Sequence, residues 1–213
     1  MLPPRLAWLK LNARHGGEAA LETWFAEQRE AISTDAPGTT LQLLVDRANP
    51  TLYFAAAAGE AAAGVAEHLR GLAVQRDLLQ DRPRLAHLER SIHFAPRDPA
   101  ADLPPGAIVR VGRHRTMPEL TDYTVEAYRD YLTAQMADPT SGFLASAMYR
   151  QADDAAVLHF FTWAVSWEAM RRHAEGAILR RVRELLNATL RDRLEIWNLE
   201  PVGRPVAVAQ ARN

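Results

Sequence analysis

The stretch GFLASAMYRQADDAAVLHFFTW, residues 142–163, indicates the fold of this chain. It reads as a glycine, a strand, a polar turn and a second strand, and residues 38–58, GTTLQLLVDRANPTLYFAAAA, follow the same plan. Gly38 and Gly142 are 104 positions apart (142 − 38), and Ile92 and Ile196 in the last expected strands have the same spacing. The repeat is too long for a solenoid unit, so it predicts two fused copies of one small domain.

Each copy reads as strand, helix, strand, strand, long helix and strand, which is the ferredoxin-like βαββαβ arrangement of the α+β class. Residues 159–163, His-Phe-Phe-Thr-Trp, do not alternate between apolar and polar, which is typical of a strand buried on both faces. We therefore expect the two sheets to pack on each other as an intramolecular pseudo-dimeric α+β barrel. The expected strands are 6–12, 39–45, 51–57, 91–95, 108–114, 143–150, 156–163 and 195–199, and the expected helical segments are 21–32, 61–80, 85–90, 118–131 and 166–189.

The chain of 213 residues then divides into four parts. Residues 1–95 form the first copy, and residues 107–200 form the second. Four prolines between residues 96 and 106 predict a semi-rigid linker, and residues 201–213 are expected to form an extended tail. The chain should act as a monomeric pseudo-dimer or as a homodimer of it.

Composition excludes several classes of function. A formal net charge of −1 predicts no general affinity for nucleic acid, and no apolar stretch approaches the roughly 20 residues that span a bilayer. The absence of cysteine rules out a thiolate nucleophile and a cysteine-ligated metal, and it favours a cytoplasmic protein. The histidines show no helical pairing with a second ligand type, so we expect no metal site.

The second copy carries a more specific signature. Residues 157–173, VLHFFTWAVSWEAMRRH, resemble the third strand and second helix of antibiotic-biosynthesis-monooxygenase-like (ABM) domains of the dimeric α+β barrel superfamily. The shared features are an aromatic strand ending in Trp163, a turn with Ser166, and a helix with His173 about two turns in. Gly142 fits the same pattern. The first copy matches in topology only, because alanines replace the aromatic strand and His68 alone echoes His173.

This resemblance implies a monooxygenase that needs no cofactor and acts on an aromatic or apolar small molecule. Such an enzyme supplies a dry pocket, a base and donors that hold an oxyanion. The candidate bases are His173 and His159, since imidazole titrates near neutrality. The candidates for binding a flat substrate are Trp163, Tyr149, Arg150 and Phe161, of which Trp163 and Phe161 share a strand face with His159.

Three other interpretations stay open. The aromatic residues could be a packed core layer, and the chain could be a non-catalytic ligand-binding or stress-associated member of the same fold. Haem-degrading members resemble one another in an Asn on the first strand, a Trp on the second helix and a ligating His about ten residues later. Ten residues beyond His173 is Arg183, whose protonated guanidinium cannot ligate iron. The first copy has Asn12 on its first strand, but the residue ten positions beyond His68 is Leu78, which cannot ligate iron either. Neither copy has the complete set.

Overall fold

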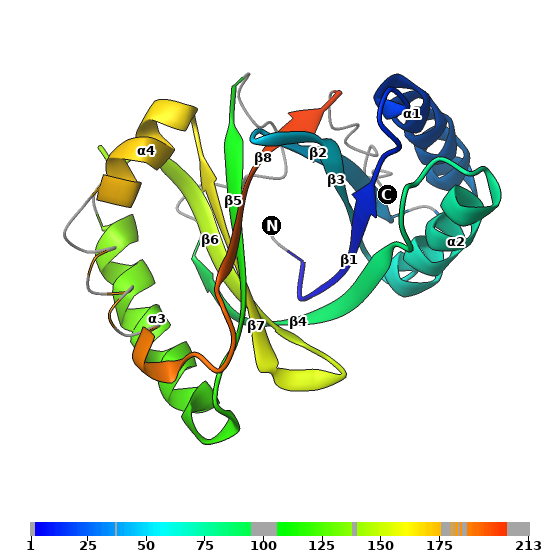
Figure 1. The fold of residues 1–213 in the computed structure, drawn as a ribbon. Helices are drawn as coiled ribbons and strands as arrows, with labels where there is room; N and C mark the ends of the chain where they lie inside the picture. The colour runs from blue at the N-terminus through cyan, green and yellow to red at the C-terminus, as the bar shows by residue number, and fades with distance from the viewer. Residues whose placement is uncertain are drawn as a thin grey trace, which may run out of the picture. The chain divides into compact units, whose positions relative to one another are not determined.

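The computed structural model describes residues 3–36, 38–94, 106–137, 140–175, 180, 182, 184 and 187–203. Within these residues the chain forms eight strands, each repeat contributes two α-helices, and a short 3₁₀ turn precedes α3 (Figure 1). The predicted α+β class with two βαββαβ repeats is confirmed. The elements are β1 (Arg5–Asn12), α1 (Glu18–Asp35), β2 (Thr40–Asp46), β3 (Asn49–Ala58), α2 (Ala62–Gln75), β4 (Arg84–Phe94), β5 (Ile108–Arg115), η1 (Pro118–Leu120), α3 (Thr121–Met136), β6 (Phe143–Gln151), β7 (Asp154–Ala164), α4 (Trp167–Glu175) and β8 (Glu195–Val202).

Contacts divide the chain into two compact units. The N-terminal unit holds Pro3–Leu88 and the residues from Leu199 onward, with the strand order β4-β1-β3-β2-β8. The C-terminal unit holds Glu89–Asn198, with the order β8-β5-β7-β6-β4. Neighbouring strands are antiparallel, as in the β1–β3 and β5–β7 pairs. The last strand of each repeat, β4 or β8, thus begins in its own unit and ends in the other one. The boundaries predicted from the sequence, at residues 95, 107 and 200, do not include this exchange of strand ends.

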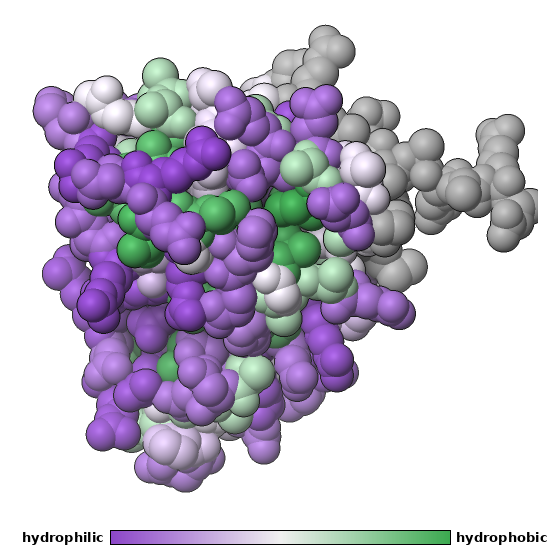
Figure 2. Space-filling view, turned by 90° about the vertical axis from the view of Figure 1, so that its right-hand side faces the viewer, coloured by the Kyte–Doolittle hydropathy of each residue, from purple (hydrophilic) through white to green (hydrophobic). Residues whose placement is uncertain are grey.

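In the N-terminal unit, α1 and α2 pack on one face of the sheet. Leu21 and Phe25 of α1 and Leu69 of α2 are almost fully buried in this core. Ala55 and Ala57 of β3 belong to the same core, so the small side chains of the alanine strand serve helix packing. The surface in Figure 2, on the side where α1 and α2 lie in Figure 1, is mostly hydrophilic and shows hydrophobic residues only in small groups.

In the C-terminal unit, α3 and α4 cover one face of the sheet. Leu158 and Phe160 of β7 pack against Tyr128 and Leu132 of α3. The ring of Phe160 lies over Gly112 of β5 so closely that a Cβ there would come within 1.8 Å of the ring. The absence of a side chain at position 112 therefore creates the space for this aromatic residue.

The start of α4 follows the predicted signal. The hydroxyl of Ser166 accepts a hydrogen bond from the backbone N–H of Ala169 at 3.2 Å, which satisfies one free donor of the first helical turn. Ala169 and Met170 then pack on Ile108 and Ala164 of the sheet. Much of the second half of the predicted helix 166–189, most of the linker 96–106, and the tail beyond residue 203 lie outside the described residues.

The glycine landmark of the repeat is confirmed. Gly38 and Gly142 have φ values of +87° and +75°, a left-handed conformation that glycine adopts without steric cost. The second landmark is wrong, because Ile92 is 5% exposed and Ile196 is 45% exposed, so the two are not equivalent.

Three further expectations need correction. Residues 85–90 are part of strand β4 instead of a helix, because α2 ends at Gln75 and Asp77 takes a positive φ of 55°. Strand β8 continues to Val202, where it pairs with Leu43, so the expected tail begins within this strand. The expected strand 108–114 continues to Arg115, and His114 is fully buried. In the part of the chain that the structure describes, no helix is both long and apolar enough to span a membrane.

Candidate functional site

The predicted site residues lie on two opposite faces of the C-terminal sheet. Leu158 and Phe160 contact α3, so by strand alternation His159, Phe161 and Trp163 point to the face without helices. The rings of Phe161 and Trp163 are stacked with centroids 5.6 Å apart, and Tyr149 meets Phe161 edge to face at 5.3 Å. These residues form the packed aromatic layer that the sequence left as an alternative to a binding site.

His159 is poorly suited to act as a base. Its side chain is buried, and Nε2 lies 3.5 Å from Oε1 of Gln151, while Nδ1 has no hydrogen-bond partner in the described structure. Burial, with smaller contributions from the charges of Arg113 and His114, lowers the pKa of His159 to about 3. An imidazole with so low a pKa stays neutral at physiological pH and holds an abstracted proton weakly.

His173 lies on the opposite face, on α4, where it meets α3. Its Nε2 is 2.6 Å from the hydroxyl of Tyr131, and its ring contacts Phe143 edge to face with centroids 4.8 Å apart. Burial raises the pKa of Tyr131, against a smaller lowering by the charge of Arg110. The Tyr131 hydroxyl is therefore protonated at neutral pH, and its oxygen can accept the hydrogen bond from Nε2–H of His173 in the tautomer that carries its basic lone pair on Nδ1.

A surface hollow of about 270 Å³ opens at His173, and we call it the His173 hollow. Its volume is near the lower end for sites that bind small molecules. The end of α3, the start of β6 and helix α4 contribute its walls. The lining residues are Ala134, Gln135, Thr140, Ser141, Phe143, Ala169, Arg172 and His173. Of the two histidines predicted as bases, His173 is the one that lines this hollow.

Gln135 is the residue of the His173 hollow that the sequence interpretation missed. It is 4% exposed, and in the described structure neither its amide oxygen nor its amide nitrogen has a hydrogen-bond partner. A signal was present, because Gln135 follows the buried Tyr128 and Tyr131 at the 3–4 residue spacing of a helix stripe. A polar side chain at a core position of a stripe needs a hydrogen-bond partner, and Gln135 has none in the described structure.

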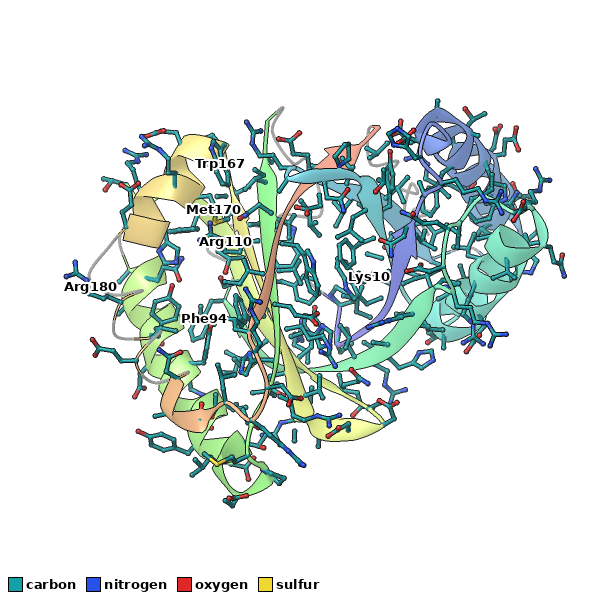
Figure 3. All side chains as sticks on the ribbon, viewed as in Figure 1. Lys10, Phe94, Arg110, Trp167, Met170 and Arg180 are labelled. Carbon is teal, nitrogen blue, oxygen red and sulfur yellow. The ribbon has the colours of Figure 1, made fainter. Side chains whose placement is uncertain are left out.

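Two arginines lie on the helix-facing side of the C-terminal sheet, and neither lines the His173 hollow. Arg110 of β5 lies on the helix-facing side of the sheet (Figure 3), where its Nε donates to Oδ1 of Asn198 at 2.9 Å. Arg150 forms an ion pair of 2.5 Å with Asp122 in the first turn of α3. It pairs with Leu158 and faces away from Tyr149, so Arg150 and Tyr149 cannot orient the same substrate together.

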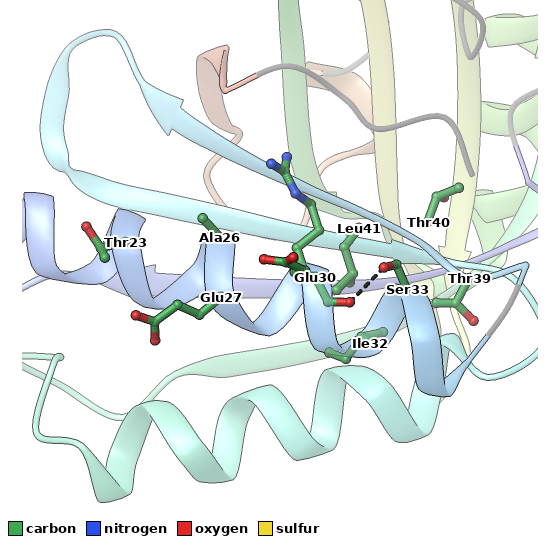
Figure 4. Close-up of a pocket in the computed structure, with 10 residues that line it drawn as sticks. Thr23, Ala26, Glu27, Glu30, Ile32, Ser33, Thr39, Thr40 and Leu41 are labelled. Carbon is green, nitrogen blue, oxygen red and sulfur yellow. Dashed lines mark hydrogen bonds between the residues drawn. The ribbon is translucent and has the colours of Figure 1, made fainter. Parts of the chain in front are cut away.

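A larger hollow of about 490 Å³ lies in the N-terminal unit, between α1 and β2 (Figure 4). Its polar groups are mainly exposed side chains such as Glu27 and Glu30, and the hydroxyl of Ser33 donates to the backbone oxygen of Glu30 at 2.7 Å. Neither a histidine nor a tyrosine lines it. The residues that line this larger hollow therefore include no side chain that could act as a base near neutral pH.

Known structures share this architecture. A protein from Fusobacterium nucleatum described as a "putative monooxygenase" superposes with a TM-score of 0.76, at 9% identity over 96% of this chain and 95% of that one. An anthrone oxidase-like protein superposes with a TM-score of 0.72, at 12% identity over 100% and 98%. The fold is that of the ABM-like α+β barrels. The haem-degrading enzyme LmHde of Listeria monocytogenes also matches, with a TM-score of 0.53 and 8% identity over 90% and 97%.

At these identities, the likenesses to ABM-like proteins establish the fold and leave the reaction open. No protein-family profile and no curated protein matches the sequence. Among the described residues, no group of three or more His, Cys, Asp or Glu side chains could hold a metal ion. Ligation of haem iron by Nε2 of His173 would require its hydrogen bond to Tyr131 to break.

Proposed function

We propose that this chain is an oxygenase that acts on a small aromatic or apolar compound without a metal or an organic cofactor. Its site is the His173 hollow of the C-terminal unit. The observation that supports it best is the 2.6 Å hydrogen bond between Nε2 of His173 and the Tyr131 hydroxyl, because it joins a base to a protonated phenol at the wall of the hollow. The similarity to an anthrone oxidase-like protein suggests an electron-rich hydroxyarene as substrate.

The proposed reaction begins with removal of a proton from the substrate by His173. Tyr131 orients the imidazole through the hydrogen bond with Nε2. The substrate anion transfers electrons to O₂ and forms a C–O bond, giving a hydroperoxide after uptake of a proton. Loss of water from the hydroperoxide leaves a carbonyl group on the ring. One O₂ is reduced as the substrate is oxidised, and one of its oxygen atoms leaves as water.

A test of this proposal is O₂ uptake by the full-length chain, without added metal, on a hydroxyarene panel of anthrone and 1-naphthol. We expect uptake that falls at least a hundredfold in His173→Ala, since general base catalysis contributes roughly 10²–10⁴-fold. His68→Ala, on α2 of the first repeat, is the control and should retain full activity. Uptake that survives in His173→Ala would refute the role of His173.

Two outcomes would replace the proposal. Binding of the panel compounds without O₂ uptake would favour the non-catalytic ligand-binding protein. A Soret band on haem titration that disappears in His173→Ala would favour a haem protein. We place the protein in the cytoplasm on the basis of its lack of cysteine.

A further inference from the structure

The wall that α4 contributes to the His173 hollow carries a positive charge. Ala169 is followed three and four positions later by Arg172 and His173, so the three residues form one helix stripe, and all of them line the hollow. The side chain of Arg172 is exposed, so a ligand that enters the hollow can reach it. Among the described residues that line the hollow, Arg172 is the one with a permanent charge, and none is an aspartate or a glutamate.

The acidic residues of α4 pair with a different arginine. Nη2 of Arg171 lies 3.1 Å from Oε1 of Glu168, and Nη1 lies 3.9 Å from Oε1 of Glu175. The hydrogen bond from Arg171 is the main cause of the lowered pKa of Glu168, and the charge of Arg172 contributes less. No ion pair joins Arg172 to another residue in the described part of the chain, so its guanidinium is available to a ligand.

We infer that the His173 hollow prefers an aromatic acid, whose carboxylate lies beside Arg172 and whose ring packs on Phe143. A guanidinium suits this role because its parallel N–H donors match the two oxygens of a carboxylate. The ring of Phe143 lines the same hollow and contacts the ring of His173 edge to face, which gives a flat ligand an aromatic surface next to the base.

This inference deepens the proposed function, on which it rests for the location of the site. It narrows the preferred substrate from hydroxyarenes in general to hydroxyarenes that carry an acid group. Arg172 would bind this group, while His173, the next residue of α4, removes the proton from the hydroxyl.

The test compares two probes of nearly the same shape, 1-naphthoate and 1-naphthamide, of which the first is an anion and the second is neutral. Dissociation constants are measured by NMR titration of the full-length chain, following the backbone resonances of Phe143 and His173. The titration is done at low ionic strength and at pH 8, where an ordinary imidazole is neutral. We expect naphthoate to bind about fivefold more tightly, at the upper end of what an exposed ion pair contributes. Salt at about 0.5 M should reduce this preference, because it screens exposed charges.

Variants then assign the preference to Arg172. In Arg172→Gln the ratio of the two constants should fall to about one. Arg171→Gln is the matched control, since it removes the same charge from the adjacent exposed position, which pairs with Glu168, and it should keep the wild-type ratio.

Several results would overturn the inference. In the wild-type chain these are equal or tighter binding of naphthamide, or no binding of naphthoate at millimolar concentration. An unchanged preference for naphthoate in Arg172→Gln would also overturn it. An equal fall in both variants would show that the net charge of α4, and not Arg172, sets the preference.

The binding assay is separable from the oxygenase assay, because neither probe carries the hydroxyl group that reacts. A preference for naphthoate that depends on Arg172, in a protein that consumes no O₂, would retain the recognition role and refute the reaction. Oxygen uptake that depends on His173, without a preference between the probes, would retain the reaction and refute the role of Arg172.

Discussion

Two buried histidines should make this protein sensitive to mild acid. His114 and His159 lie on neighbouring strands of the C-terminal sheet, and burial lowers their pKa values to about 4 and about 3, with the charge of Arg113 adding to the effect. Both imidazoles are therefore neutral in the folded chain at pH 5. In the unfolded chain they titrate near the ordinary value of about 6.5. The unfolded state thus binds more protons than the folded state as the pH falls below this value.

This difference in bound protons sets both the direction and the size of the change in the free energy of unfolding with pH. A lowered folded pKa gives stability that is present above pH 6.5 and is lost as the pH falls toward the folded pKa. For each histidine the loss between pH 7 and pH 5 is about 2 kcal/mol, or about 4 kcal/mol for both. Small domains are stable by only about 5–15 kcal/mol, so this loss is a large share of the total.

The assay is urea denaturation followed by circular dichroism at pH 7, 6 and 5. His114→Leu and His159→Leu should each remove about half of the loss between pH 7 and pH 5, and the double variant should remove most of it. At pH 7, His114→Leu should be neutral or stabilising, because neither ring nitrogen of His114 has a hydrogen-bond partner in the described structure. Equal stability of the wild-type chain at pH 7 and pH 5 would show that the two buried histidines do not make the protein sensitive to acid. An unchanged loss of stability in both single variants would show the same.

Two further substitutions test the C-terminal unit. Tyr131→Phe removes the hydroxyl that orients His173, so kcat/KM on the hydroxyarene panel should fall about tenfold and the acidic limb of the pH–rate profile, which reports the essential base, should shift. Tyr123→Phe, at a position that is 59% exposed, should change neither, and equal profiles for the two variants would exclude the positioning role. Gly112→Ala places a methyl group 1.8 Å from the ring of Phe160 and should lower the free energy of unfolding by about 1–3 kcal/mol, measured by urea denaturation. Gly71→Ala on α2 meets open space and should raise it by about 0.5–1 kcal/mol; a Gly112→Ala variant as stable as Gly71→Ala would show that the ring packs elsewhere.

Sequence periodicity predicted the order of the elements because the apolar pattern of each strand and helix is local. Gly38 and Gly142 marked equivalent turns, since the left-handed backbone there restricts the residue type. The last strands were harder to predict. The end of each belongs to the other unit, so their register depends on partners distant in sequence, and Ile92 and Ile196 consequently differ in burial.

The site was predicted only in part. The family signature indicated His173, and strand alternation placed His159 with Phe161 and Trp163, but the sequence could not show which sheet face carries the helices and the hollow. Tyr131 and Gln135 were not predicted as site residues because they come from a different helix, α3, and meet His173 only through tertiary packing.

The position of a bound ligand decides whether the His173 hollow is the active site. We propose a crystal structure of the full-length chain grown without oxygen in the presence of 1-naphthol, so that the compound binds and does not react. We expect ligand density in the His173 hollow, with the hydroxyl oxygen within about 3 Å of the imidazole of His173. Density in the hollow between α1 and β2, or against His159 on the opposite face of the sheet, with the His173 hollow free of ligand, would contradict it.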